Sequence, residues 1–152
     1  MQSDIELVKR TLKNAELGDM AGMGADMAEG FRFSGATPEP LNKAQFLDLM
    51  RALTAALPNW RFNISEIRET GNTVSMVNSI TGKNTGVLDF PSLGINSLPA
   101  TGRKVALPAE AIDVVVMNGR ISEFKVTPTP GGGLMGIFSQ LGIKVPAHAG
   151  AR

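Results

Sequence analysis

The spacing of hydrophobic residues along the chain changes at Pro58. Before this residue, apolar side chains recur every three or four positions, as on one face of an α-helix; after it, they alternate with polar ones, as in β-strands. Helices followed by a run of strands favour an α+β domain in which a curved antiparallel sheet wraps over three N-terminal helices. No internal repeat or domain boundary interrupts residues 1–152, so we predict a single domain.

Three helices are predicted in the first part of the chain. Ser3 and Glu6 have the spacing of a capping box, and Asn42 can cap a later helix that Pro58 ends. Asp19 can cap a shorter helix between these two, which carries three methionines at helical spacing. We interpret this stripe as core, because Met fills irregular gaps. The three methionines are Met20, Met23 and Met27.

Strands follow wherever the hydrophobic period shortens to two. A short strand is predicted at residues 31–33. Five longer strands cover residues 60–69, 73–81, 86–90, 103–117 and 120–127. Asn118 and Gly119 between the last two are the strongest hairpin signal, because a type I′ turn needs positive φ at both positions.

The sheet is predicted to end near residue 127, where a Pro/Gly loop occupies residues 128–133. Residues 134–143 then form an apolar segment, which predicts a short helix that closes the open end of the sheet or docks on a second subunit. A mobile lid hinged on the three glycines of the loop is the alternative. Residues 146–152 are predicted to be a frayed tail.

Composition limits the chemistry and the partners. The net charge is +1, and no stretch gathers Lys or Arg into a stripe, so we expect no nucleic-acid partner. No apolar run reaches the roughly 20 residues that span a bilayer, and the N-terminus is acidic and polar, so we expect a cytoplasmic protein without a membrane partner. There is no Cys or Tyr, and the only His is His148 in the predicted tail. We therefore predict neither a metal nor a cofactor, and any acid or base must be a carboxylate or a Lys.

Several motifs resemble the SnoaL-like polyketide cyclase family. Residues 57–62 (LPNWRF) are similar to its proline-plus-strand opening, and residues 101–105 (TGRKV) to the start of its fourth long strand. The ending is the most specific: residues 118–124 (NGRISEF) and the later segment 134–142 are similar to the family's last strand and trailing helix. The resemblance implies the cone-shaped fold of the wider nuclear transport factor 2-like, or cystatin-like, superfamily. It also implies a homodimer, and a pocket between the helices and the concave face of the sheet.

The same resemblance implies that the usual catalytic groups are missing. The cyclases carry a general acid/base Asp on the last strand with a His two residues before it, and these positions are Val126 and Phe124 here. Another His of many relatives falls on Asn84. Related ketosteroid isomerases need a Tyr, which the chain lacks, and the Asp-Arg-Asp group of the superfamily's epoxide hydrolases cannot be placed.

Alternation along the strands predicts which side chains face the pocket. If Phe124 and Val126 point inward, so does Ser122, because side chains alternate across a strand. Asn78 is then the polar exception on an apolar inward face, either as a satisfied structural amide or as a ligand contact. The predicted pocket lining is Phe33, Met76, Asn78, Ile80, Ile112, Val114, Phe124 and Val126. Trp60 is interpreted as core.

Three carboxylates are candidate catalytic groups. Glu110 and Asp113 lie on opposite faces of one strand, so only one of them can enter the cavity. Burial would raise the pKa of that residue and suit it to acid–base chemistry. Otherwise each is an exposed strand-end carboxylate or an interface ion pair. Asp89 is a weaker candidate on a short strand.

These observations leave three hypotheses. The leading one is a pocket protein that resembles the cyclases, lacks their acid/base, and binds a small hydrophobic molecule. The second is an active cyclase or isomerase with a relocated carboxylate, most plausibly Glu110. The third is a non-catalytic dimerisation module that uses the outer sheet face, which carries Val115 and Met117.

Overall fold

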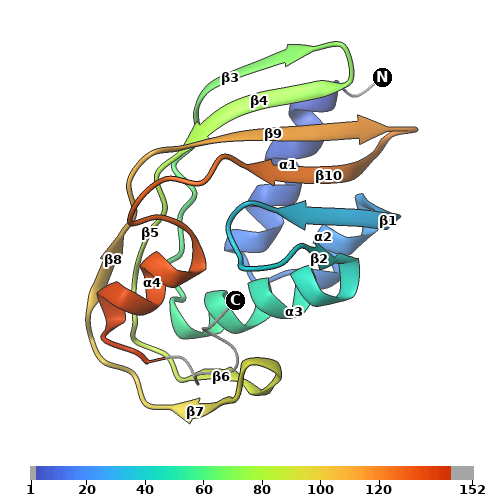
Figure 1. Ribbon diagram of the computed structural model, residues 1–152. Helices are drawn as coiled ribbons and strands as arrows, with labels where there is room; N and C mark the ends of the chain where they lie inside the picture. The colour runs from blue at the N-terminus through green and yellow to red at the C-terminus, as the bar shows by residue number, and fades with distance from the viewer. Residues whose placement is uncertain (1–2, 145–152) are drawn as a thin grey trace.

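The computed structural model describes residues 3–144, so the predicted tail with His148 lies outside the described residues. A long curved sheet wraps around the N-terminal helices, as Figure 1 shows. The helices are α1 (Asp4–Glu16), α2 (Met20–Ala25), α3 (Lys43–Ala56) and α4 (Gly133–Leu141), with a short 3-10 helix η1 (Pro91–Leu93). None of the helices in this part of the chain is long and apolar enough to cross a membrane.

The predicted helix starts are confirmed. Ser3 Oγ accepts a hydrogen bond from the backbone N–H of Glu6, and Asn42 and Gln45 exchange the two bonds of a capping box at the start of α3. Asp19 caps α2 in the same way, through the N–H of Gly22. The second helix is shorter than predicted, because Met27 already belongs to the first strand.

The main sheet has six strands in the order β2-β1-β10-β9-β4-β3. These are β1 (Met27–Ser34), β2 (Leu41–Asn42), β3 (Ser65–Thr70), β4 (Thr73–Asn78), β9 (Glu110–Met117) and β10 (Arg120–Val126). The prediction of an antiparallel sheet is wrong at one place, where β1 and β10 run parallel with Phe33 opposite Phe124. The sheet is therefore mixed, because β1 leaves the helices in the same direction as the final strand.

Two small antiparallel sheets extend the main one and carry the chain around the cavity. They pair β5 (Thr81–Lys83) with β8 (Lys104–Ala106), and β6 (Leu88–Phe90) with β7 (Ile95–Leu98). The predicted strand at 73–81 is thus divided into β4 and β5, and the one at 103–117 into β8 and β9 on either side of Pro108. Only the second half of residues 60–69 is a strand, and β7 was not predicted.

The hairpin between β9 and β10 is confirmed, since φ is 53° at Asn118 and 73° at Gly119. The alternation in β10 contains a bulge. Ile121 pairs with Val116 and Glu123 with Val115, so Ser122 is an extra residue that shifts the register. Ser122 is consequently only half-buried, which corrects its predicted inward position.

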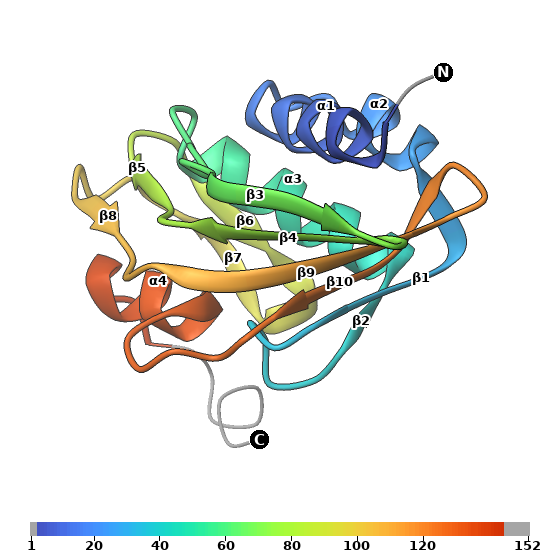
Figure 2. The same ribbon diagram turned by 90° about the horizontal axis from the view of Figure 1, so that it is seen from above.

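Helices and sheet enclose one core. Figure 2 shows α1 and α3 on the inner side of the curved sheet, where α1 packs against β3 and β4 and α3 packs against β1. Helix α4 contacts β8 at the open end of the sheet. The helix predicted at residues 134–143 is thus present, and whether it closes the sheet, docks on a second subunit or acts as a lid stays a prediction. The position of α4 leaves room for a cavity between α3, α4 and the ends of the long strands.

Candidate functional site

A narrow cavity of about 50 Å³ lies between α3 and the ends of β4, β9 and β10, and the first turns of α4 close it. Five of the predicted lining residues border it: Phe33, Asn78, Ile80, Phe124 and Val126. The other three, Met76, Ile112 and Val114, do not. They are buried farther along the same inner face, where the helices pack on the sheet, so they belong to the core and the prediction of a larger lining is corrected.

The side of the cavity opposite the sheet is lined by residues outside the strands, so the alternation of side chains in strands did not predict them. Helix α3 contributes four apolar side chains, and the segment after it contributes Trp60 and Phe62. The aromatic rings lie close to one another, with ring centroids 4.5 Å apart for Phe33 and Phe46 and 5.8 Å apart for Trp60 and Phe62. The α3 residues are Phe46, Leu49, Met50 and Leu53. Their helical spacing predicted an inward face but not its role in a cavity.

Glu110 is the only ionisable side chain in this lining. Its side chain is 3% exposed, and its Oε1 accepts a long hydrogen bond of 3.4 Å from the backbone N–H of Gly133. Gly132 lies so close that a Cβ atom there would collide with the carboxyl group. Burial raises the pKa of Glu110 above its ordinary value, and hydrogen bonds from the backbone of Gly133 and Thr129 partly oppose the shift.

Three buried side-chain atoms within residues 3–144 have no hydrogen-bond partner, and all three belong to residues of the cavity lining. They are Trp60 Nε1, Asn78 Oδ1 and Glu110 Oε2. Asn78 and Glu110 stand opposite each other in the β4–β9 ladder. Because an unpaired buried polar group costs roughly 1–3 kcal/mol, three of them at one cavity identify it as the candidate site.

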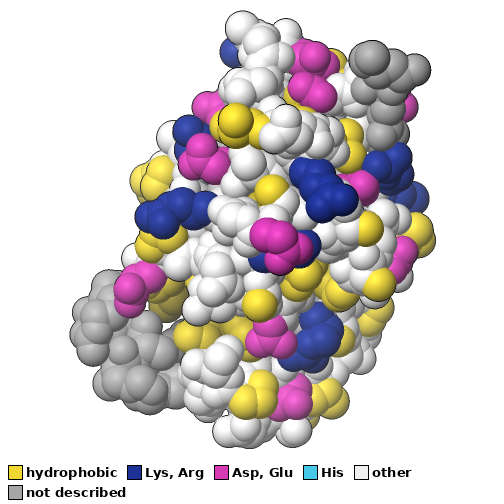
Figure 3. All heavy atoms as spheres, turned by 90° about the vertical axis from the view of Figure 1, so that its right-hand side faces the viewer, with side chains coloured by type: hydrophobic (Ala, Val, Ile, Leu, Met, Phe, Trp, Pro, Cys, Tyr) yellow, Lys and Arg dark blue, Asp and Glu magenta, His cyan; other side chains and the backbone are white. Residues whose placement is uncertain are grey.

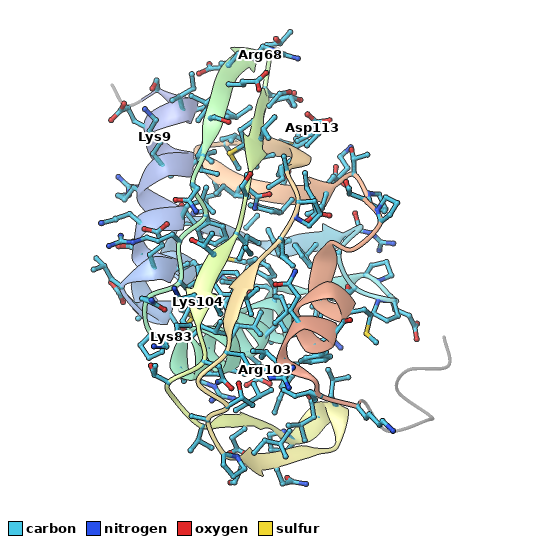
Figure 4. The ribbon with its side chains drawn as sticks, turned by 90° about the vertical axis from the view of Figure 1, so that its left-hand side faces the viewer. Lys9, Arg68, Lys83, Arg103, Lys104 and Asp113 are labelled. Carbon is cyan, nitrogen blue, oxygen red and sulfur yellow. The ribbon has the colours of Figure 1, made fainter. Side chains whose placement is uncertain are left out.

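The other two candidate carboxylates are outside the cavity. Asp113 is exposed on the outer face of β9, on the other side of the sheet from α1 (Figure 4), and accepts a 2.7 Å hydrogen bond from Ser75 Oγ. Asp89 is also exposed and accepts from the backbone N–H of Ser97 at 3.1 Å. Neither borders the cavity, so the structure does not bring these two candidates to the candidate site.

Asn84, which the family resemblance aligned with a histidine, is a structural amide. It is 1% exposed, its Nδ2 donates to the carbonyls of Ala56 and Gly86, and its Oδ1 accepts from Thr101. All its hydrogen-bonding groups are used and it does not border the cavity. Its role is to hold the chain between β5 and β6 against the end of α3.

A larger groove of about 630 Å³ adjoins the cavity on the outside. Thr37, Leu49 and Leu134 line both spaces, so the two are adjacent. The remaining groove lining is mainly apolar: Pro38, Glu39, Pro40, Leu41, Ala44, Gln45, Asp48, Phe90, Ser92 and Leu93.

On the face of the molecule in Figure 3, acidic and basic side chains are interspersed, without a single-sign stripe.

Nothing in residues 3–144 groups three or more potential metal ligands. The donor set at the cavity is one carboxylate and one amide, which is too small for a dedicated metal site. The chemistry available there is hydrogen bonding and proton transfer in apolar surroundings.

The helices and the curved mixed sheet form an α+β fold of the nuclear transport factor 2 and ketosteroid isomerase type. The SnoaL-like domain family matches residues 8–124, and the chain belongs to this family. The search of curated proteins found no match.

Solved structures of similar fold cover nearly the whole chain. A proposed SnoaL-like polyketide cyclase from Jannaschia sp. CCS1 is 15% identical, with a TM-score of 0.68 over 91% of this chain and 90% of that one. IdmH of Streptomyces antibioticus, a proposed polyketide cyclase, is 17% identical, with a TM-score of 0.68 over 93% of this chain and all of its own. A ketosteroid isomerase-like protein from Catenulispora acidiphila, solved with trimethylamine, is 13% identical, with a TM-score of 0.65 over 91% and 94% of the two chains. At these identities the similarity establishes the fold alone.

Proposed function

We propose that this protein binds a small, largely apolar molecule in the cavity at Glu110. The observation that carries the proposal is that three residues with a buried, unpartnered polar atom, Trp60, Asn78 and Glu110, line one apolar space. Sites for small molecules are mostly apolar with a few placed polar groups that fix orientation. A bound molecule with matching donors and acceptors would remove the cost of leaving these atoms unpaired.

The descriptions of related structures are consistent with a protein that takes up a small molecule. Two of them are described as proposed polyketide cyclases, and a third contains a small organic molecule. The cavity is smaller than the roughly 150 Å³ of an engineered cavity that holds benzene, so only a small group enters it without movement of α4. The adjoining groove offers space for the rest of a larger molecule.

The test uses Trp60, the only tryptophan of the chain, as a built-in probe. Small cyclic ketones, alcohols and phenols are titrated while its fluorescence is recorded. Fragments that enter the cavity should change the emission of wild type and of Asp113→Asn, whose substitution lies on the outer sheet face. Val126→Phe, which fills the cavity, should abolish the response. The proposal fails if no fragment alters Trp60 emission in wild type, or if Val126→Phe responds like wild type.

A second candidate function is acid–base catalysis of the cyclase or isomerase type by Glu110. A buried carboxyl with a raised pKa and one oxygen without a hydrogen-bond partner is suited to donate and accept a proton. It would replace the family's acid/base, whose position is occupied here by Val126. Turnover of a β-keto and polyketide-like substrate panel should then disappear in Glu110→Gln, while binding measured through Trp60 is kept. Equal rates in the two proteins would exclude Glu110 as the catalytic group.

We further propose a homodimer through the outer face of the main sheet. Met117 is 53% exposed there and Val115 lies beside it at a half-buried position. This face points away from the cavity, so dimerisation and ligand binding are compatible.

A further inference from the structure

The charged side chains that line the cavity and the groove are all acidic. Among the described residues, the two linings contain three carboxylates and no Lys or Arg: Glu39, Asp48 and Glu110. Asp48 is paired with Arg51 at 2.6 Å, whereas Glu39 and Glu110 form no ion pair within residues 3–144. A negatively charged molecule would therefore find no counter-ion, and a positively charged one would find two carboxylates along its path.

The cavity wall adds a second feature that favours a cation. Five aromatic residues line a space of only about 50 Å³ beside the Glu110 carboxyl. The face of an aromatic ring carries negative potential, which attracts an ammonium group within about 6 Å of the ring centroid. The five are Phe33, Phe46, Trp60, Phe62 and Phe124. Aromatic rings around one buried carboxylate form a site for a small organic cation.

The two unpartnered oxygens supply the matching hydrogen-bond acceptors. Asn78 Oδ1 and Glu110 Oε2 belong to side chains that are 4% and 3% exposed, and their residues are direct cross-strand neighbours. Neighbouring side chains on one face of an antiparallel pair have Cβ atoms roughly 5 Å apart, so one donor group can reach both. An ammonium group has up to three N–H donors and no acceptor, which fits two adjacent acceptors better than a hydroxyl group does.

We propose that the ligand is an organic amine, bound as its ammonium ion between Glu110 and Asn78, with its apolar body extending past Leu134 into the outer groove. This inference rests on the proposed binding function and names the chemical class of the ligand. The head group suits the small cavity, and the groove of about 630 Å³ accommodates the body. Thr37, Leu49 and Leu134 border both spaces and mark the passage between them.

Binding of the cation is coupled to the proton of Glu110. Burial raises the pKa of this carboxyl, so below that pKa the free protein holds the proton. When the ammonium ion binds, the O–H bond of Glu110 breaks, the proton passes to the buffer, and the carboxylate pairs with the ligand. Helix α4, strand β4 and residues 127–133 carry no charged side chain. In the segments between elements, Arg61 lies between Trp60 and Phe62 and pairs with Glu16, and Glu39 lines the groove. The charged side chains of the other elements around the cavity are Glu29, Arg32, Lys43, Asp48, Arg51, Asp113, Arg120, Glu123 and Lys125. Of these, only Asp48 lines either space.

The experiment compares two probes of nearly equal shape, n-hexylamine and n-hexanol, by calorimetry and Trp60 fluorescence. Wild type should bind hexylamine at least about tenfold more tightly than hexanol, which corresponds to about 1.4 kcal/mol. Glu110→Gln should lose this preference and still bind hexanol, whereas Asp113→Asn should behave like wild type. Titrations of hexylamine in two buffers of different ionisation enthalpy, at a pH below the pKa of Glu110, should show release of a proton by wild type and none by Glu110→Gln.

The outcomes separate this inference from the proposed function. Hexanol binding as tightly as hexylamine to wild type overturns the amine inference and leaves small-molecule binding intact. This comparison needs no variant, so it holds even where Glu110→Gln fails to fold. Failure of both probes to bind, together with silence of Trp60 toward the neutral fragments above, overturns the binding function itself.

Discussion

The side-chain amide of Gln140 makes two hydrogen bonds with the backbone of Ala106. Its Oε1 accepts from the Ala106 N–H at 2.8 Å, and its Nε2 donates to the Ala106 carbonyl at 2.9 Å. Ala106 is the last residue of β8, whose free edge is thereby paired by the amide as if by another strand. The contact fixes α4, whose Leu134 and Ile137 close the cavity.

Replacing Gln140 with Ala should therefore loosen α4 while the rest of the fold persists. Loss of two hydrogen bonds worth roughly 0.5–1.5 kcal/mol each should lower the free energy of unfolding by about 1–3 kcal/mol in urea titrations. Hydrogen exchange should accelerate in α4 and not in α1. Gln140→Glu keeps an oxygen that accepts from the Ala106 N–H but places a second acceptor against the Ala106 carbonyl, so it should not retain the stability of wild type. Equal acceleration in both helices would contradict a local role for this contact.

Gly132→Ala should disturb the Glu110 carboxyl directly. The backbone φ of Gly132 is −98°, which Ala tolerates, so the effect of the substitution comes from the collision of its Cβ with Glu110. Overpacking of this kind costs roughly 1–3 kcal/mol in unfolding free energy. The same change in a Glu110→Ala background should cost much less, because the colliding group is gone. A double-mutant cycle without coupling between the two positions would show that they do not touch.

Features that depend on near neighbours in the chain were predictable from the sequence. The caps at Ser3 and Asn42 and the turn at Asn118 need only a few adjacent residues, and all three are confirmed. The parallel pairing of β1 with β10 was not predictable, because its partners are far apart in sequence and periodicity carries no strand direction. The break between β8 and β9 had a visible signal in Pro108, which cannot donate to a strand ladder.

Only the part of the candidate site that lies on the strands could be predicted from the sequence, through the alternation of side chains. Alternation correctly separated Glu110 from Asp113 and turned Asn78 inward, because it fixes the face of a sheet that each side chain occupies. It does not say how far along that face the helices fill the space. Met76 was therefore assigned to the pocket although it is core. Trp60 lines the cavity because of the way α3 packs against the sheet. Strand alternation does not predict this packing.

The proposed homodimer predicts a mass change in one surface variant. Wild type should sediment at twice the mass of the chain over a dilution series, and Met117→Lys should sediment as a monomer, because an unpaired charge buried in an interface is costly. Lys83→Glu, on the separate β5–β8 sheet, should remain dimeric (Figure 4). A wild-type monomer at high concentration would refute the interface. Ligand binding measured through Trp60 should be the same in both variants.

Glu110 should make the stability of the protein fall as the pH rises. Its pKa in the folded protein lies above the ordinary value of about 4.5, so the folded state binds more protons than the unfolded state between these two pKa values. Unfolding free energy therefore decreases with rising pH across that window and is constant, as far as this group is concerned, on either side. The slope should be seen as the difference between wild type and Glu110→Gln, which has no proton to lose there, in urea titrations at a series of pH values. Asp113→Asn, at an exposed position, serves as the matched control and should follow wild type. A difference that grows in the opposite direction would mean that the Glu110 carboxylate is stabilised as an ion in the folded protein, and its assignment as a buried, proton-holding group would be wrong.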